Sequence, residues 1–214
     1  MKSYKNLVSI VALLLFGQFS LAEVDLLKKH VFYLHGAIIE KGDLKPIHPQ
    51  YGLYDYPAII NALSSHGFHF ISEQRGINTD HVSYAKKVSA QINDLISKGV
   101  KPEGITVIGF SKGAMITAIT SSLLKNKDLN FVIMATCGDW YESEGLLSEL
   151  RLYGNILSVY EESDLAGSCQ NLANRSPAPS SFTEIAINTG KQHGAFYLPR
   201  DEWIKPVVFW IKEK

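Results

Sequence analysis

Apolar residues occur along the chain in short blocks, and six of these blocks predict buried strands. The blocks are rich in β-branched and aromatic residues, which is typical of strands that are covered on both faces. The predicted strands are residues 30–39, 68–72, 104–110, 130–136, 155–160 and, with a weaker pattern, 185–188.

The segments between these blocks carry apolar residues at helical spacing. Pro57 suits the first turn of a helix, Asp80 suits an N-cap, and Gly99 suits a helix end. The predicted helices are residues 57–66, 82–96, 112–124, 143–152 and 203–212. This alternation predicts an α/β fold with a mostly parallel sheet, helices on both faces and an active site at the carboxyl ends of the strands. Residues 173–181 have a loop-like composition and are predicted to form an exposed connection.

The clearest chemical signal is the sequence Gly-Phe-Ser-Lys-Gly at residues 109–113, which has the form G-x-S-x-G. By itself this pattern is weak, but here a predicted strand precedes it and a predicted helix follows it. That context is typical of a nucleophile elbow, in which a tight turn presents the serine at a helix N-terminus. Ser111 is therefore the predicted nucleophile.

A serine hydroxyl needs a base to take its proton, and the base needs an acid to hold its tautomer. His193 lies in a polar loop directly after the last predicted strand and is the predicted base. Asp164 follows the strand at 155–160 and is the predicted acid. Asp139 follows the preceding strand and remains the alternative.

Two backbone N–H groups would complete the site as an oxyanion hole. The first is the N–H of Lys112, directly after the serine. The second is expected from Ala37, because Gly36 lets the backbone of that turn approach closely. His35 is predicted to hold the turn.

Several residues near these positions are weaker candidates for substrate binding. Arg75 and Glu73 end the second predicted strand, where they form either a local salt bridge or, through Arg75, a site for a substrate carboxylate or phosphate. The Lys112 side chain either attracts anionic substrates or points into solvent. Tyr54 belongs to a group of aromatic residues that line either an acyl pocket or the core; the others are Tyr51, Tyr56, Trp140 and Tyr141.

The composition suits one globular domain, since 46% of the 214 residues are hydrophobic and 20% are charged. Residues 1–22 are predicted to be a cleaved secretory signal peptide, and residues 23–214 the folded domain. Two lysines precede an apolar run at 7–16, and Ser20 and Ala22 fit a cleavage site after Ala22. A bilayer needs about 20 apolar residues, so no stable membrane anchor is expected after cleavage. The predicted location is secreted or periplasmic.

Charge and motifs exclude several classes of function. Basic and acidic side chains number 21 each, which gives no footprint for nucleic acid. The sequence has no H-E-x-x-H motif and no paired-cysteine spacing, so neither a metal site nor a cofactor is expected. The expected partner is a small-molecule ester substrate, and the oligomeric state is left open.

The two cysteines, Cys137 and Cys169, predict a disulfide in an exported protein, the alternative being two buried thiols. Cys137 ends one predicted strand, and Cys169 follows the next one, beyond Asp164. In a parallel sheet those ends are expected to be neighbours, and a bridge there would restrain the loop of the predicted acid.

Taken in order, the strand followed by His-Gly, the G-x-S-x-G motif, the late Asp and the late His-Gly resemble the α/β-hydrolase superfamily. Within it, the chain is similar to small bacterial hydrolases of the esterase and lipase kind, over essentially residues 31–214. The resemblance implies an eight-stranded fold, of which this chain lacks the first one or two antiparallel strands. Only residues 137–154 separate two predicted strands where large caps are usually inserted, so no large cap is expected.

These features predict a serine hydrolase that cleaves carboxylic esters or thioesters of small or short-acyl substrates through an acyl-enzyme on Ser111. A serine peptidase or amidase, or a hydrolase of envelope acyl groups, is the alternative within catalysis. A non-catalytic binding protein on the same fold is the alternative outside it.

Overall fold

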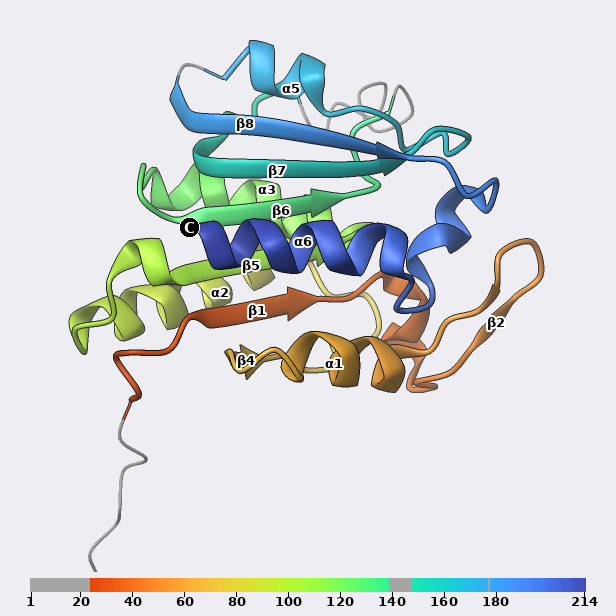
Figure 1. Ribbon diagram of the computed structural model, residues 1–214, viewed down its shortest axis with the longest axis horizontal. Helices are drawn as coiled ribbons and strands as arrows, with labels where there is room; N and C mark the ends of the chain where they lie inside the picture. The colour runs from red at the N-terminus through yellow and green to blue at the C-terminus, as the bar shows by residue number, and fades with distance from the viewer. Residues whose placement is uncertain (1–23, 139–147, 177) are drawn as a thin grey trace, which may run out of the picture.

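A computed structural model describes residues 24–138, 148–176 and 178–214. The predicted signal peptide and Asp139, Trp140 and Tyr141 lie outside the described residues. Within them, a parallel six-stranded sheet has the order β4-β1-β5-β6-β7-β8 (Figure 1). The strands are β1 (His30–Leu34), β4 (His69–Ile71), β5 (Ile105–Phe110), β6 (Asn130–Met134), β7 (Tyr153–Glu161) and β8 (Ala178–Ile187).

Helices cover both faces of this sheet, and each face has its own hydrophobic core. On one face, Ile59 of α1 (Tyr56–Ser64) and Trp203 of α6 (Asp201–Glu213) are fully buried. The other face is covered by α2 (His81–Ser97), α3 (Lys112–Leu124) and the short α5 (Gln170–Asn174). Figure 1 shows α6 in front of the sheet and α2 and α3 behind it.

Local capping explains where two of the helices begin. The Asp55 side chain accepts a hydrogen bond from the Ala58 N–H at 3.0 Å, and Asp80 accepts one from the Ser83 N–H at 2.8 Å. Each bond satisfies a backbone donor that the first turn of a helix leaves free. Asp80 is thus the N-cap that its position in the sequence predicts.

The prediction for residues 173–181 was wrong, because this segment is not an exposed connection. It contains the end of α5 and the beginning of β8, which pairs with β7 along its whole length. A strand at the sheet edge needs partners on one side only, so it tolerates Pro179 and the serines that follow it. The short β2 (Ile47–His48) and β3 (Gly52–Leu53), which form an antiparallel hairpin, were also not predicted.

Strand order places the region of interest at the carboxyl ends of β1 and β5. From β1 the chain first crosses to β4 on one side and then returns to β5 on the other. Such a reversal leaves a crevice beyond the carboxyl ends of the two strands. The turns that contain Gly36 and Ser111 follow β1 and β5, respectively.

Candidate active site

Ser111 occupies a strained turn between β5 and α3. Its backbone has φ 54° and ψ −119°, a region that non-glycine residues rarely adopt. Such a conformation costs on the order of 1–3 kcal/mol and persists only where the surroundings impose it. The Ser111 N–H donates to the Met134 carbonyl at 2.9 Å, which fixes the turn against β6.

The two glycines of the motif make this turn possible. A Cβ atom on Gly113 would collide with the Leu34 carbonyl oxygen, and one on Gly109 would collide with the Gly113 carbonyl oxygen and the Thr117 hydroxyl. Neither backbone obstacle can move without disturbing the sheet or α3. Side chains at positions 109 and 113 are therefore excluded by the packing of α3 against the ends of β1 and β5.

His193 and Asp164 come together beside this turn. His193 lies in the 3₁₀ helix η3 (Gln192–Phe196) after β8, and Asp164 lies in the loop after β7. The His193 Nδ1 is 2.8 Å from an Asp164 carboxylate oxygen, and their side chains are 16% and 6% exposed. The His193 ring centroid lies 4.9 Å from that of Phe110, the residue before Ser111. A carboxylate beside Nδ1 favours the tautomer with its proton there, in which Nε2 is the ring nitrogen available to the predicted base.

The three predicted catalytic side chains are not linked by a continuous set of hydrogen bonds. Within the described part of the chain, the Ser111 hydroxyl makes no hydrogen bond to His193. Catalytic hydrogen bonds are often long before substrate binds and tighten in the reacting complex.

A buried carboxylate that the sequence did not point to connects the loops of Asp164 and His193. Glu161 is fully buried at the end of β7. One of its oxygens accepts from the N–H groups of Thr189 and Gly190 at 3.0 and 2.9 Å, and the other accepts from the Ser163 N–H at 2.7 Å. Burial by itself raises the pKa of Glu161, but the hydrogen bonds from Ser163, Thr189 and Gly190 bring the pKa below its ordinary value. Glu161 therefore acts as an ionised brace between the two loops.

The turn after β1 lies against the turn that carries Ser111. A Cβ atom on Gly36 would be 3.6 Å from the Ser111 Cβ and 3.0 Å from Cε1 of Phe110. Ala37 begins the 3₁₀ helix η1 (Ala37–Lys41), and Lys112 begins α3. The first N–H groups of a helix have no acceptor within it, so neither predicted oxyanion donor is used by its own helix.

The Arg75 and Lys112 side chains have a partner that neither sequence interpretation considered. The Arg75 side chain is fully buried, with its Nε 3.1 Å from one oxygen of Glu40; the Lys112 Nζ lies 2.6 Å from the other. Glu73 instead pairs with Lys87 and accepts from the Tyr84 hydroxyl. Arg75 is thus not positioned to bind a substrate, because its guanidinium is enclosed. Lys112 neither points freely into solvent nor has an unpaired charge.

Tyr54 does not line the site either. It is fully buried, its hydroxyl lies 3.2 Å from that of Tyr33, and its ring stacks on Phe110 beneath the turn. Among the described members of that group, Tyr51, on the hairpin between β2 and β3, borders the site, with its ring centroid 5.8 Å from that of His193. The sequence placed both tyrosines in one group, and only packing separates them.

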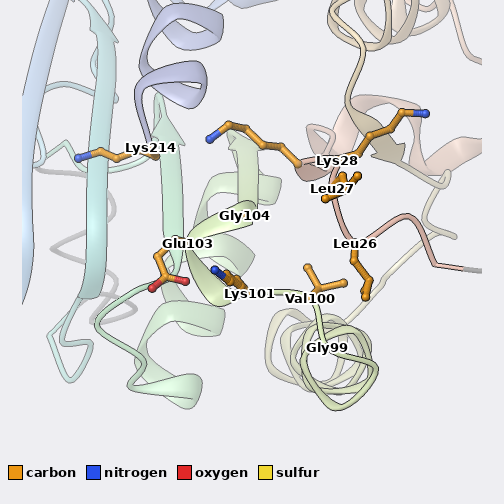
Figure 2. Close-up of a pocket in the computed structure, with 10 residues that line it drawn as sticks. Leu26, Leu27, Lys28, Gly99, Val100, Lys101, Glu103, Gly104 and Lys214 are labelled. Carbon is orange, nitrogen blue, oxygen red and sulfur yellow. The ribbon is translucent and has the colours of Figure 1, made fainter.

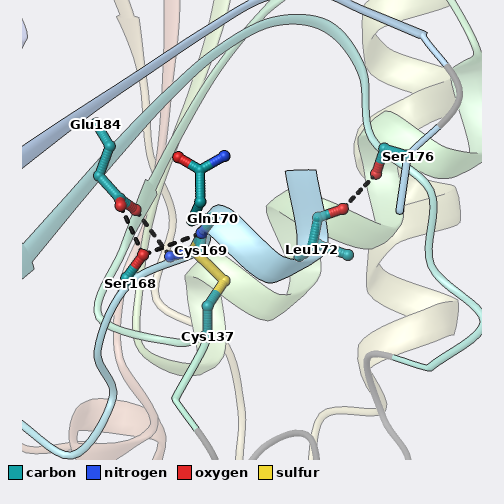
Figure 3. Close-up of a disulfide and its surroundings, with 7 residues drawn as sticks. All are labelled: Cys137, Ser168, Cys169, Gln170, Leu172, Ser176 and Glu184. Atoms are coloured by element: carbon teal, nitrogen blue, oxygen red, sulfur yellow. Dashed lines mark hydrogen bonds between the residues drawn. A yellow bond between two sulfur atoms is a disulfide. The ribbon is translucent and has the colours of Figure 1, made fainter. Parts of the chain in front are cut away.

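The structure contains the predicted disulfide between Cys137 and Cys169, with Cα atoms 4.8 Å apart (Figure 3). Cys137 also donates its N–H to the Ala166 carbonyl at 3.0 Å, and the Cys169 N–H donates to Glu184 of β8 at 2.8 Å. The bridge therefore joins the segment after β6 to the segment that follows Asp164.

A cavity of about 640 Å³ lies at the opposite, amino-terminal edge of the sheet (Figure 2). Its lining includes Lys29, directly before β1, and Gly104, directly before β5. It is separated from Ser111 by the length of these strands and takes no part in the site. Among the described residues, no cluster of three metal-ligating side chains is present, and no helix has the length and apolar character needed to cross a membrane.

Comparison with known proteins adds information on the fold. At the level of sequence, no protein-family model and no curated protein matches this chain. Among the solved structures that are similar, three illustrate the likeness. SOBER1 from Arabidopsis thaliana is 15% identical, with 86% of this chain and 98% of that one covered and a TM-score of 0.54. Esterase PE8 is 16% identical, with 87% and 92% covered and a TM-score of 0.56. A hyperthermophilic esterase from the archaeon Pyrobaculum calidifontis is 14% identical, with 87% and 77% covered and a TM-score of 0.58.

Proposed function

Because the chain has the α/β-hydrolase fold, we propose that it is a serine hydrolase that cleaves carboxylic esters or thioesters through an acyl-enzyme on Ser111. The observation that carries this proposal is the hydrogen-bonded pair of His193 and Asp164 beside the strained turn at Ser111. A structural strand–helix turn needs neither a backbone at φ 54° nor a histidine held by a nearly buried carboxylate.

The proposed reaction has two halves. The Ser111 oxygen bonds to the acyl carbon while its proton passes to Nε2 of His193, and the carbonyl electron pair moves onto the oxygen. The N–H groups of Ala37 and Lys112 stabilise that charge. The intermediate then expels the alcohol or thiol, which takes the proton from His193, and the acyl-enzyme remains. In the second half, water gives its proton to His193 and bonds to the acyl carbon, and the acid leaves as the Ser111 oxygen takes the proton back. Asp164 keeps His193 in the required tautomer and stabilises its protonated form.

We propose that the substrates are small or have short acyl groups. Residues 135–152 are the whole connection between β6 and β7, which is too short for a large cap. Without a cap, little apolar surface is available to cover a long chain, and each unburied CH₂ group forgoes about 0.8 kcal/mol. A secreted or periplasmic location is also part of the proposal, since a disulfide forms and persists in oxidising compartments.

Covalent labelling tests the nucleophile directly. We expect a fluorophosphonate probe to label the mature protein at Ser111, and Ser111→Ala and His193→Ala each to abolish ester hydrolysis while the protein stays folded. Members of such a triad act as a unit, so the double variant should be little worse than either single variant. Near-wild-type turnover by folded Ser111→Ala protein would exclude the proposed mechanism.

A further inference from the structure

Glu40 is a buried carboxylate near the proposed oxyanion hole, and nothing in the proposed reaction uses it. It lies on η1, the 3₁₀ helix that Ala37 begins, and is 8% exposed. Carboxylates are rarely buried unless they are paired. Here each oxygen has its own cation, Arg75 at 3.1 Å and Lys112 at 2.6 Å. The Glu40 carboxylate thus connects η1, which begins with the proposed donor Ala37, to Lys112, which carries the other proposed donor.

The Arg75 branch continues to the peptide that contains the Ala37 N–H. The Arg75 backbone N–H donates to Nε2 of His35 at 2.7 Å, and the Arg75 guanidinium donates to the His35 carbonyl. Because Nε2 accepts, the proton of neutral His35 is on Nδ1, which donates to the Gly36 carbonyl at 2.7 Å. Nη2 of Arg75 is 3.2 Å from Nδ1, but with a hydrogen on both atoms this is a contact and not a hydrogen bond.

Because the peptide between Gly36 and Ala37 is planar and trans, the bond from His35 to the Gly36 carbonyl also sets the orientation of the Ala37 N–H. The carbonyl of Gly36 and the N–H of Ala37 belong to the same planar peptide and point in opposite directions. By holding the carbonyl, His35 fixes the direction in which the Ala37 N–H points. His35 stays neutral in this role, because burial, followed by the charge of Arg75, lowers its pKa to about 3.

We infer that Glu40 is a positioning residue for the oxyanion hole, aligning both donors: Ala37 through Arg75 and His35, and Lys112 through its side chain. This inference rests on the proposed function, because it needs an oxyanion to form at Ser111. In this inference Lys112 has two roles: its backbone N–H is a proposed oxyanion donor, and its side chain holds that donor in place through Glu40.

Charge and geometry predict opposite effects when Glu40 is neutralised, which makes the inference testable. Glu40→Gln removes a negative charge near a developing oxyanion and leaves two cations, so electrostatics alone would speed the reaction. Loss of the shared anchor for Arg75 and Lys112 would instead misalign the donors and slow it. A fall in rate therefore identifies positioning.

The experiment compares Glu40→Gln, Lys112→Met and Lys112→Arg with the wild type and with Asp94→Asn. Asp94 forms an exposed ion pair with Lys98 on α2 and serves as the control for loss of a carboxylate. The first readout is the rate at which a fluorophosphonate labels Ser111: the serine oxygen bonds to phosphorus, fluoride leaves with its bonding pair, and the proton goes to His193. The second readout is kcat and KM on a short-acyl ester. The third is the set of backbone amide NMR signals of Ala37 and Lys112, together with the His35 tautomer.

We expect Glu40→Gln to lower the labelling rate and kcat about 10- to 100-fold with little change in KM, since misplaced donors cost transition-state stabilisation. Lys112→Met should lower the labelling rate and kcat by a smaller factor than Glu40→Gln does, and Lys112→Arg should keep values close to those of the wild type. Asp94→Asn should have the same labelling rate and kcat as the wild type. The amide signals of Ala37 and Lys112 should both shift in Glu40→Gln. Folded Glu40→Gln protein with unchanged or faster labelling, or with both amide signals in place, would overturn the inference. Failure of the wild type to label would instead overturn the proposed function, and the amide signals would still decide whether Glu40 positions the two N–H groups.

Discussion

Ser111 is the residue at which backbone strain and proposed chemistry coincide. Its unusual φ is imposed by close contacts that only glycine permits at positions 109 and 113, and by a hydrogen bond to β6. The strain is therefore supported by the whole carboxyl edge of the sheet. Two buried carboxylates hold the neighbouring segments: Glu40 pairs with Arg75 and Lys112, and Glu161 accepts from the N–H groups of Ser163, Thr189 and Gly190.

At the same scale, Glu161 makes stability depend on pH. Its folded-state pKa is lowered, so its contribution to the free energy of unfolding is complete above the unfolded pKa of about 4.3 and is lost as pH falls through the folded value. At pH 7 we expect Glu161→Gln to lower the free energy of unfolding by about 1–3 kcal/mol, because the amide –NH₂ would face backbone N–H donors. Below about pH 4 the difference in free energy of unfolding between the variant and the wild type should become smaller. Urea denaturation at several pH values measures both effects.

Glu162→Gln is the matched control, because Glu162 is exposed and accepts a single side-chain bond from Asn188. It should change the free energy of unfolding little. If the difference in free energy of unfolding between Glu161→Gln and the wild type stayed constant down to pH 3, Glu161 would not be acting as an ionised brace.

At the scale of elements, the disulfide joins the carboxyl end of β6 to the start of α5 across 32 residues. In the chain-entropy account, closing a loop of this length contributes roughly 3–4 kcal/mol. We expect Cys137→Ala with Cys169→Ala to lower the free energy of unfolding by about that amount, measured by urea denaturation. Reductant should destabilise the wild type to a similar extent and leave the double variant unchanged. Equal stability of the oxidised wild type and the double variant would show that the bridge does not restrain the fold.

At the scale of the whole molecule, the proposed preference for short acyl groups rests on the short connection between β6 and β7. We expect the mature protein to hydrolyse acetyl to hexanoyl esters faster than palmitoyl esters and to show no increase in rate above the critical micelle concentration of its substrate. Rates on an ester series that differs only in chain length, measured below and above that concentration, provide the comparison. A preference for long chains would assign a lid role to the β2–β3 hairpin, whose Ile47 is 77% exposed.

The sequence alone predicted the features that depend on neighbouring residues. Most of the strands and helices follow from hydrophobic periodicity, and the elbow follows from three fixed positions between a strand and a helix. The predicted helix at 143–152 is an exception: residues 143–147 lie outside the described residues, and residues 148–152 are not helical. Lys112–Leu124 agrees with the predicted helix to the residue. Of the edge strand β8, only the carboxyl end at residues 185–188 was predicted, because a strand paired on one side carries a weak apolar pattern.

Tertiary structure decided the features that depend on partners far apart in the chain. Glu161 meets Thr189 across 28 positions, Arg75 meets Glu40 across 35, and Lys112 meets Glu40 across 72. No local pattern signals such pairs, because a charged residue at a strand end has the same sequence context whether it faces solvent, a substrate or a buried partner. Burial selects among these outcomes, since an enclosed charge must find a counter-charge or donors. For that reason the meeting of Asp164 with His193 and the Cys137–Cys169 bridge could be predicted from the sequence, whereas the buried carboxylates Glu40 and Glu161 and their partners could not.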